Sequence, residues 1–148
     1  MVGLHEHYYK NGQLHERTIY KNGKAHGSWE IFYKNGQLHE RTIYKNGKPD
    51  GLYENFDDNG QLSYKFNYKN GSKYGLLEQF HENGQLQYKI NYQDGKFHGL
   101  VECYNEKGLL KEKGNHKNGE IHGIYEYFDE EGNLTKTETY KDGKLIEE

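Results

Sequence analysis

The sequence YKNGQLHERTIYKNGK occupies residues 9–24 and recurs unchanged at residues 33–48. Outward from these two copies, the same pattern continues with substitutions along the chain. Neighbouring copies follow one another without a linker, so the repeat predicts one repeat domain over residues 1–148. The six units of 24 residues open at Gly3, Gly27, Gly51, Gly75, Gly99 and Gly123.

Two glycine turns divide each unit into two short strands. If the opening glycine is counted as position 0, Gly recurs at positions 9 and 20, usually after Asn or Asp. Such dipeptides between β-forming runs mark hairpin turns. The sequence therefore predicts an all-β fold, a single elongated, twisted antiparallel β-meander of about twelve strands built from six 24-residue hairpin repeats.

Three repeated side chains suggest the strand register. An aromatic residue stands at position 5, Leu at position 11 and Tyr at position 17, where only the fifth unit differs, with His116. A three-residue Lys-Asn-Gly loop at each turn would pair position 5 with 11 and position 17 with 21, which places all three side chains on one face. We therefore expect odd positions to form an apolar face and even positions a polar face. The Glu at position 3 of every unit is expected to be structural, as an acceptor for turn amides or Tyr hydroxyls.

The composition indicates a folded protein and argues against several classes of function. Aromatic residues make 15% of the chain, which is typical of a folded protein although only 32% of residues are apolar. The net charge of -3 offers no general attraction to nucleic acid. The single Cys103 excludes an intramolecular disulfide, and the absence of a signal-like or membrane-spanning stretch favours a cytoplasmic protein.

The sequence contains no motif whose spacing predicts a catalytic or cofactor-binding site. Neither a nucleophile elbow, a phosphate-binding glycine loop nor a Ser/His/Asp arrangement occurs, so we expect neither an enzyme nor a cofactor. His5 and His7 share a face, and the predicted register places His15 opposite His7. With no further ligand on that face, these side chains are expected to be solvated and to bind no metal. Gly114, at a position that carries larger residues elsewhere, suggests a bend.

Apolar residues at even positions of the first two units predict a partner-binding surface. The expected register pairs Trp29 with Arg41, close enough for a cation–π contact, and places Ile31 opposite His39. Aromatic and aliphatic residues beside Arg are typical of interface hot spots, although the same residues could also pack on themselves if the sheet curls. The predicted partner-binding residues are Ile19, Trp29, Ile31, Tyr33, Arg41 and Ile43.

The unit pattern GxxExFxxNGQLxxxxxYxNGKxxG resembles the MORN-variant repeat and, in its Glu at position 3 and its Leu after the turn, the bacterial YwqK antitoxin family. The resemblance implies an extended β-meander that serves in protein scaffolding, lipid headgroup binding or toxin neutralisation. It favours a protein-binding repeat module, an antitoxin or immunity protein whose partner is another protein, such as a toxin. The alternative is a structural scaffold or a reader of membrane-lipid headgroups, with peripheral membrane contact through a basic stripe at position 14. That stripe consists of Arg17, Arg41, Lys65, Lys89 and Lys113.

Overall fold

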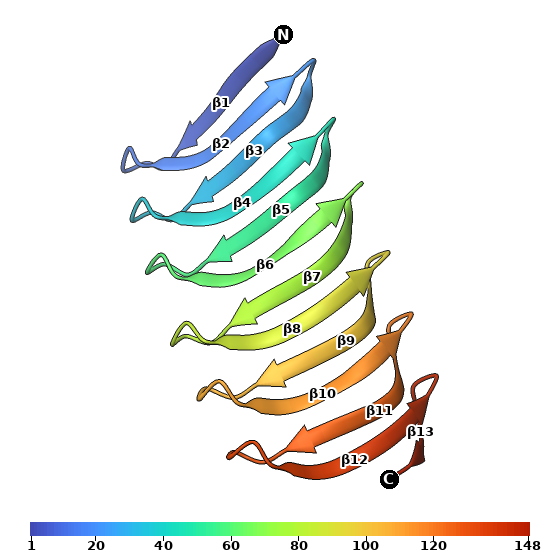
Figure 1. Ribbon diagram of the computed structural model, residues 1–148. Coiled ribbons are helices and arrows are strands. Elements are labelled where there is room, and N and C mark those ends of the chain that lie inside the picture. Colours follow the sequence, from blue (N-terminus) through green and yellow to red (C-terminus); the bar gives the residue numbers. More distant parts are fainter. The chain divides into compact units, whose positions relative to one another are not determined.

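The computed structural model describes residues 1–148 and consists of β-strands joined by tight turns. The antiparallel strands follow one another in the sheet in the order of the chain, which confirms the predicted β-meander (Figure 1). The count is thirteen rather than about twelve, because the chain continues past its last turn into a short final strand. No helix of the protein is long and apolar enough to cross a bilayer. The strands are Val2–Tyr8 (β1), Leu14–Lys21 (β2), Lys24–Phe32 (β3), Leu38–Lys45 (β4), Lys48–Phe56 (β5), Leu62–Lys69 (β6), Ser72–Phe80 (β7), Leu86–Gln93 (β8), Lys96–Tyr104 (β9), Leu110–Lys117 (β10), Glu120–Phe128 (β11), Leu134–Lys141 (β12) and Lys144–Glu147 (β13).

The chain divides into two compact units, residues 1–72 and 73–148, which are described separately. The first unit contains β1 to β6, and the second contains β7, which begins at the boundary, to β13. Within each unit, the turns that join the two strands of a repeat, such as β1 to β2, lie at one end of the strands (Figure 1). The turns that lead to the next repeat, such as β2 to β3, lie at the other end (Figure 1).

The three-residue loop is confirmed at the first turn of each repeat. In the first repeat, the Gly12 amide donates to the Tyr9 carbonyl at 3.0 Å and the Tyr9 amide donates to the Gln13 carbonyl at 2.8 Å. These bonds close a loop of Lys, Asn and Gly, in which Gly12 has a φ of 86°. Position 5 consequently pairs with position 11 in all six repeats, as Tyr8 does with Leu14.

At the second turn the predicted register is wrong. Lys21 pairs with Lys24, so the loop has two residues, and Tyr20 at position 17 pairs with Ala25 at position 22. Both loop residues have positive φ, 52° at Asn22 and 78° at Gly23. Positive φ at both loop residues is typical of a type I′ turn. Its twist matches the right-handed twist of the flanking strands, which favours it over the predicted three-residue loop.

Bulges disturb the ladder, and the bulge in the first hairpin of every repeat overturns the expected assignment of odd and even positions to faces. Within the first hairpin, His7 pairs with Glu16, not with His15, because the residue at position 12 is bulged out of the ladder. The second bulge lies at the opening glycine, where Gly27 has a φ of 100° and the register shifts between Thr18 and the next pair. The bulged residues at position 12 are His15, His39, Ser63, Gln87, Lys111 and Thr135.

The pairing defines two faces. We call the face that carries positions 2, 4, 13, 15, 17 and 22 the core face, and the face that carries positions 1, 3, 5, 11, 14, 16, 18 and 21 the ion-pair face. Cross-strand partners lie on the same face, and the ring of Trp29 on the core face lies 5.1 Å from that of Tyr44. Every side chain in the buried core belongs to the core face. These residues are Thr18, Ala25, Phe66, Leu77, Val101, Cys103, Tyr125 and Glu138.

Candidate functional site

The structure separates the six residues predicted to bind a partner. Trp29 and Ile31 lie on the core face, whereas Ile19, Arg41 and Ile43 lie on the ion-pair face. None of the six is among the exposed large apolar side chains, and each is half-buried. They therefore do not form the single exposed patch that the sequence predicts.

The predicted cation–π contact is absent because the bulge moves the register by one residue. Trp29 pairs with Thr42, and Arg41 pairs instead with Glu30 on the opposite face. The indole Nε1 of Trp29 is buried without a hydrogen-bond partner. Ile31 lies opposite Glu40, so its predicted pairing with His39 is also wrong.

Tyr33 is a structural side chain of the loop edge. Its hydroxyl donates a hydrogen bond of 2.7 Å to the Phe56 carbonyl of the next repeat, and its ring stacks on His39 with centroids 4.2 Å apart. Tyr9 repeats the arrangement, with a bond of 2.6 Å to the Phe32 carbonyl. These contacts join consecutive loops, so replacing Tyr33 would disturb the fold as well as any interface.

The basic stripe at position 14 is neutralised by the glutamates at position 3. Arg41 donates to a single carboxylate oxygen of Glu54 from Nε at 3.1 Å and from Nη2 at 2.6 Å. Arg17 pairs with Glu30 in the same way, with Nη2 at 3.1 Å. The stripe therefore offers no row of unpaired cations to a lipid surface. In the second unit, Lys113 lies 3.4 Å from Glu126, and Lys89 lies opposite both Glu78 and Glu102.

The glutamates at position 3 also accept hydrogen bonds from aromatic hydroxyls, which supports their structural role. Tyr8 donates to Glu6 at 3.0 Å, and Tyr104 donates to Glu102 at 2.9 Å. Burial and then the bond to Glu102 raise the pKa of Tyr104 to about 12, so the phenol keeps its proton as a donor.

An aliphatic row on the ion-pair face of the first unit is the surface that the sequence reasoning missed. It contains Leu4, Ile19, Ile43 and Leu52, which we call the aliphatic row. Leu4 is 58% exposed and Leu52 is 38% exposed. Ile43 lies over the glycine bulge of the next repeat, since a Cβ built on Gly51 would lie 3.2 Å from the Ile43 Cβ. Ser28 interrupts this row between Ile19 and Ile43, and in the second unit Asn91, Asn115 and Thr139 stand at the position of the two isoleucines.

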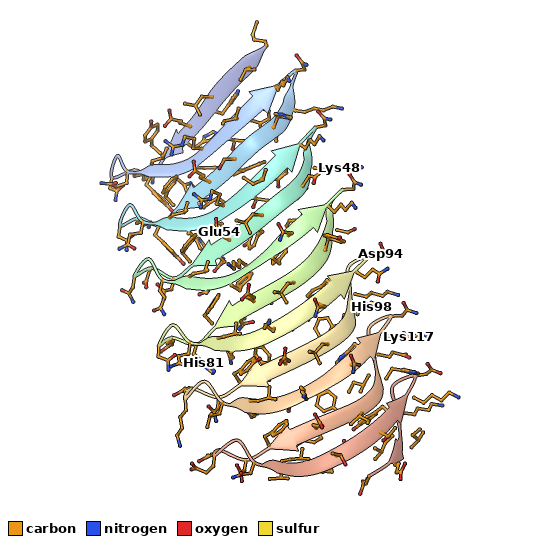
Figure 2. All side chains as sticks on the ribbon, in the orientation of Figure 1. Lys48, Glu54, His81, Asp94, His98 and Lys117 are labelled. Carbon is orange, nitrogen blue, oxygen red and sulfur yellow. The ribbon has the colours of Figure 1, made fainter.

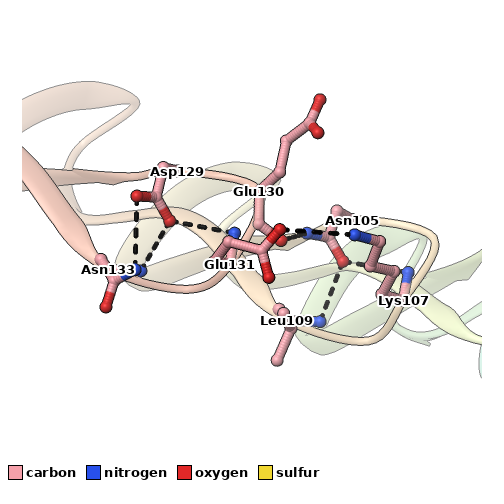
Figure 3. Close-up of polar contacts among 7 residues, drawn as sticks. All are labelled: Asn105, Lys107, Leu109, Asp129, Glu130, Glu131 and Asn133. Carbon is pink, nitrogen blue, oxygen red and sulfur yellow. Dashed lines mark hydrogen bonds and ion pairs between the residues drawn. The ribbon is translucent and has the colours of Figure 1, made fainter.

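A cavity of about 480 Å³ lies at the loop edge of the second unit. Its walls include two consecutive loops that are tied by side chains (Figure 3). The Asn105 amide group accepts from the amides of Lys107 and Leu109 at 3.0 Å and donates to the Glu130 carbonyl at 3.3 Å. Asp129 accepts from the amides of its own loop, which lower the pKa of its carboxyl group. The lining residues are His81, Gln87, Tyr88, Cys103, Tyr104, Asn105, Glu106, Lys111, Phe128, Asp129 and Glu130.

The only thiol in this cavity is not activated. Cys103 is 6% exposed, and burial, followed by the charge of Glu112, raises its pKa. A thiol with a raised pKa is protonated at neutral pH and is a weak nucleophile and metal ligand. No group of three or more His, Cys, Asp or Glu side chains is arranged to hold a metal ion.

The fifth repeat departs from the others at two core-face positions. Gly114 has no positive φ, and the ring of Tyr125 covers it in a close packing contact. His116 stands where the other repeats have Tyr, with its ring centroid 5.4 Å from that of Phe97 and its Nδ1 buried without a partner.

Because of His116, we expect the free energy of unfolding to decrease in weak acid. Burial lowers the pKa of His116 below the ordinary value of 6.5, so the unfolded chain binds the proton more tightly than the folded chain. The free energy of unfolding should therefore fall as the pH falls below about 6.5. Urea titrations at pH 7.5 and at pH 5.5 measure the effect. The variant His116→Tyr, which restores the residue of the other repeats, should reduce the difference, and an unchanged difference would place its origin in other groups.

The family comparison agrees with the repeat seen in the structure. The model of the MORN repeat variant matches five segments of 22 residues, 1–22, 25–46, 49–70, 73–94 and 121–142. The unmatched stretch between the last two segments contains the divergent Gly114 and His116. No curated protein sequence matches the chain. Because the matched segments cover most of its length and coincide with the hairpin repeats of the structure, the chain belongs to the family of MORN repeat variant proteins.

Proposed function

We propose that this protein is a protein-binding repeat module that docks its partner on the ion-pair face of the first unit. The observation that carries the proposal is the aliphatic row, in which Leu4 and Leu52 are exposed and Ile19 and Ile43 are half-buried. The ion pairs Arg17–Glu30 and Arg41–Glu54 border this row. An apolar strip beside balanced, oriented charges is typical of protein interfaces. MORN repeats in general bind proteins or lipids, and the neutralised basic stripe favours a protein over a lipid headgroup.

Within this class, we propose that the protein acts as an antitoxin or immunity protein that neutralises a toxin by covering it. The support is the resemblance of the repeat to the YwqK type, together with the aliphatic row and its bordering ion pairs on one face of the sheet. Such a function needs no chemistry from the chain, only an interface tight enough to block the active surface of the partner.

A photo-crosslinking residue placed at Val2, which is 67% exposed and lies two residues before Leu4 in β1, identifies the partner in extracts of the native host. The identified protein is then purified, and its affinity is measured for the unmodified chain and for variants. Leu52→Asp should weaken binding about tenfold or more, because it places a charge in the centre of the interface. Leu100→Asp is the matched control, because Leu100 occupies the same repeat position in the second unit and is equally exposed, at 38%. Equal affinities for both variants would contradict the proposed surface.

The antitoxin proposal has its own test. Expression of the identified partner alone should arrest growth, and co-expression of this chain should restore it. The Leu52→Asp variant should fail to restore growth at equal expression. A partner without any effect on growth would contradict the antitoxin role but leave the binding module intact.

A further inference from the structure

Four lysines of the first unit form a row at the edge of its two-residue turns. Lys21 lies directly opposite Lys24, and Lys45 lies directly opposite Lys48. We call these four residues the lysine row. Like charges directly opposite each other destabilise a sheet, so the fold gains nothing from these pairs. Figure 2 shows Lys48 at this edge, with Glu54 farther along the same strand, β5.

The two lysine pairs lie on adjacent turns. A Cβ built on Gly47 would lie 3.8–3.9 Å from Cβ, Cγ and Cδ of Lys24, so the Lys24 stem crosses the turn of the following repeat. All four lysines are exposed, and no carboxylate forms an ion pair with any of them. The closest carboxylate along the chain is Asp50, two residues after Lys48. The ammonium groups therefore concentrate positive charge that is not balanced locally.

The second unit lacks such a row at the corresponding turns. Lys96 lies opposite Gln93, and Lys117 lies opposite Glu120. Its third turn has Lys141 opposite Lys144, but Asp142 in the loop lies beside them. The charges that flank the two-residue turns are thus mixed in the second unit. They are purely basic at the first two such turns of the first unit.

The lysine row continues directly from the aliphatic row. Lys21 is two residues from Ile19, and Lys45 is two residues from Ile43, so both lysines share the ion-pair face with those isoleucines. From the turn edge inward, this face presents lysines, then aliphatic side chains, then ion pairs without net charge. An interface with an apolar centre and a charged border has the same order.

We propose that the lysine row binds acidic side chains at the border of the partner protein, next to the apolar patch that covers the aliphatic row. This inference rests on the proposed function and specifies the chemistry of the partner: Asp and Glu beside aliphatic residues. The unbalanced charge is confined to one strip, because the next charged row is neutralised internally. A strip of this kind suits a few carboxylates at an interface border, whereas a membrane or a nucleic acid would present phosphates to the whole face.

The test uses a fluorescently labelled peptide in which Glu and Leu alternate, with a Gln–Leu peptide of the same length as its control. The unmodified protein should bind the Glu–Leu peptide and not the Gln–Leu peptide. The double variant K21E/K45E should weaken binding about tenfold or more, and added salt should weaken binding to the unmodified protein. The variant is expected to fold, since it turns two like-charge pairs into opposite-charge pairs.

The matched control is K96E/K141E, which changes the net charge equally at the same edge of the second unit. It should leave the affinity within about twofold, since Lys96 and Lys141 belong to the second unit and are not part of the lysine row. Equal losses for both variants, or no binding of the Glu–Leu peptide, would overturn the proposal. Tighter binding to poly(U) RNA or to phosphatidylserine vesicles than to the peptide would also overturn it. Because these probes do not involve the natural partner, failure here is separate from failure of the Leu52→Asp experiment.

Discussion

Replacing Phe66 by alanine is expected to lower the free energy of unfolding by about 4 kcal/mol, the largest effect of any single truncation in the first unit. Phe66 is 3% exposed, and its ring centroid lies 4.7 Å from that of Tyr53 and 4.9 Å from that of Tyr68. Its removal would leave a cavity in the centre of this aromatic cluster and expose the neighbouring rings. Burial also raises the pKa of the neighbouring Tyr53.

Urea unfolding followed by far-UV circular dichroism measures the loss, and hydrogen exchange locates it. In a repeat array each hairpin depends mainly on its neighbours, so protection should fall most in β5 and β6. Tyr8→Ala is the control, because Tyr8 is 59% exposed and its replacement should cost less than about 1 kcal/mol. A similar cost for both variants would mean that the aromatic cluster does not stabilise the unit.

Replacing Gly114 by valine is expected to lower the free energy of unfolding by about 3 kcal/mol through overpacking. A Cβ built on Gly114 would lie 2.0 Å from Cδ2 and 2.8 Å from Cγ of Tyr125, so the ring would have to leave its site. Tyr125 is 8% exposed, and its hydroxyl donates to Glu112 at 3.2 Å. Displacing the ring would therefore also break a hydrogen bond.

A double-mutant cycle separates this steric effect from a backbone effect. The Tyr125→Ala change removes the ring that the valine side chain would meet. The double variant should therefore lose less free energy of unfolding than the two single variants lose together, by at least about 1 kcal/mol. Gly3→Val is the control, because a Cβ at Gly3 meets no atom within 4 Å. Additive losses would show that Gly114 is needed for its backbone and not for its contact with Tyr125.

Packing on the core face accounts for some of the sequence variation between repeats. At positions 2 and 15, Thr18 and Thr42 flank Trp29, and Gly114 lies opposite Tyr125. In these pairs a small residue compensates for the volume of a large one on the neighbouring strand. In the third repeat both residues are large, because Tyr53 stacks on Phe66. Such positions are not evidence for a binding site, and the variant residues that remain for function are those on the ion-pair face and at the turn edges.

Part of this arrangement could be predicted from local sequence. The hairpin repeat, the Lys-Asn-Gly loop and the pairing of position 5 with 11 are specified by turn residues a few positions apart. The bulge at the opening glycine also has a local signal, since Gly inside a strand often marks a bulge. The bulge at position 12 has none, because His, Ser, Gln, Lys and Thr all occupy it.

The candidate site depended on the bulge at position 12. One extra residue moves every following side chain to the other face, so Trp29 and Arg41 separate and Ile43 joins the side that carries Leu52. The same shift brings each position-14 cation beside a position-3 carboxylate of the next repeat. These partners are more than ten residues apart in the chain, and no turn motif specifies them.

By itself, the sequence determined the β-meander and its repeat, because Asn-Gly and Asp-Gly dipeptides mark where each strand ends and turns back. It did not determine the loop length, since the same Tyr-Lys-Asn-Gly string forms a three-residue loop at the first turn and a two-residue loop at the second. Only the tertiary structure decided which face is the core, that the basic stripe is neutralised and that the lysines of two turns gather beside an aliphatic row. The physical reason is that a side-chain face alternates with every residue, so it depends on the summed register of each strand pair, whereas the place of a turn is marked by its own few residues.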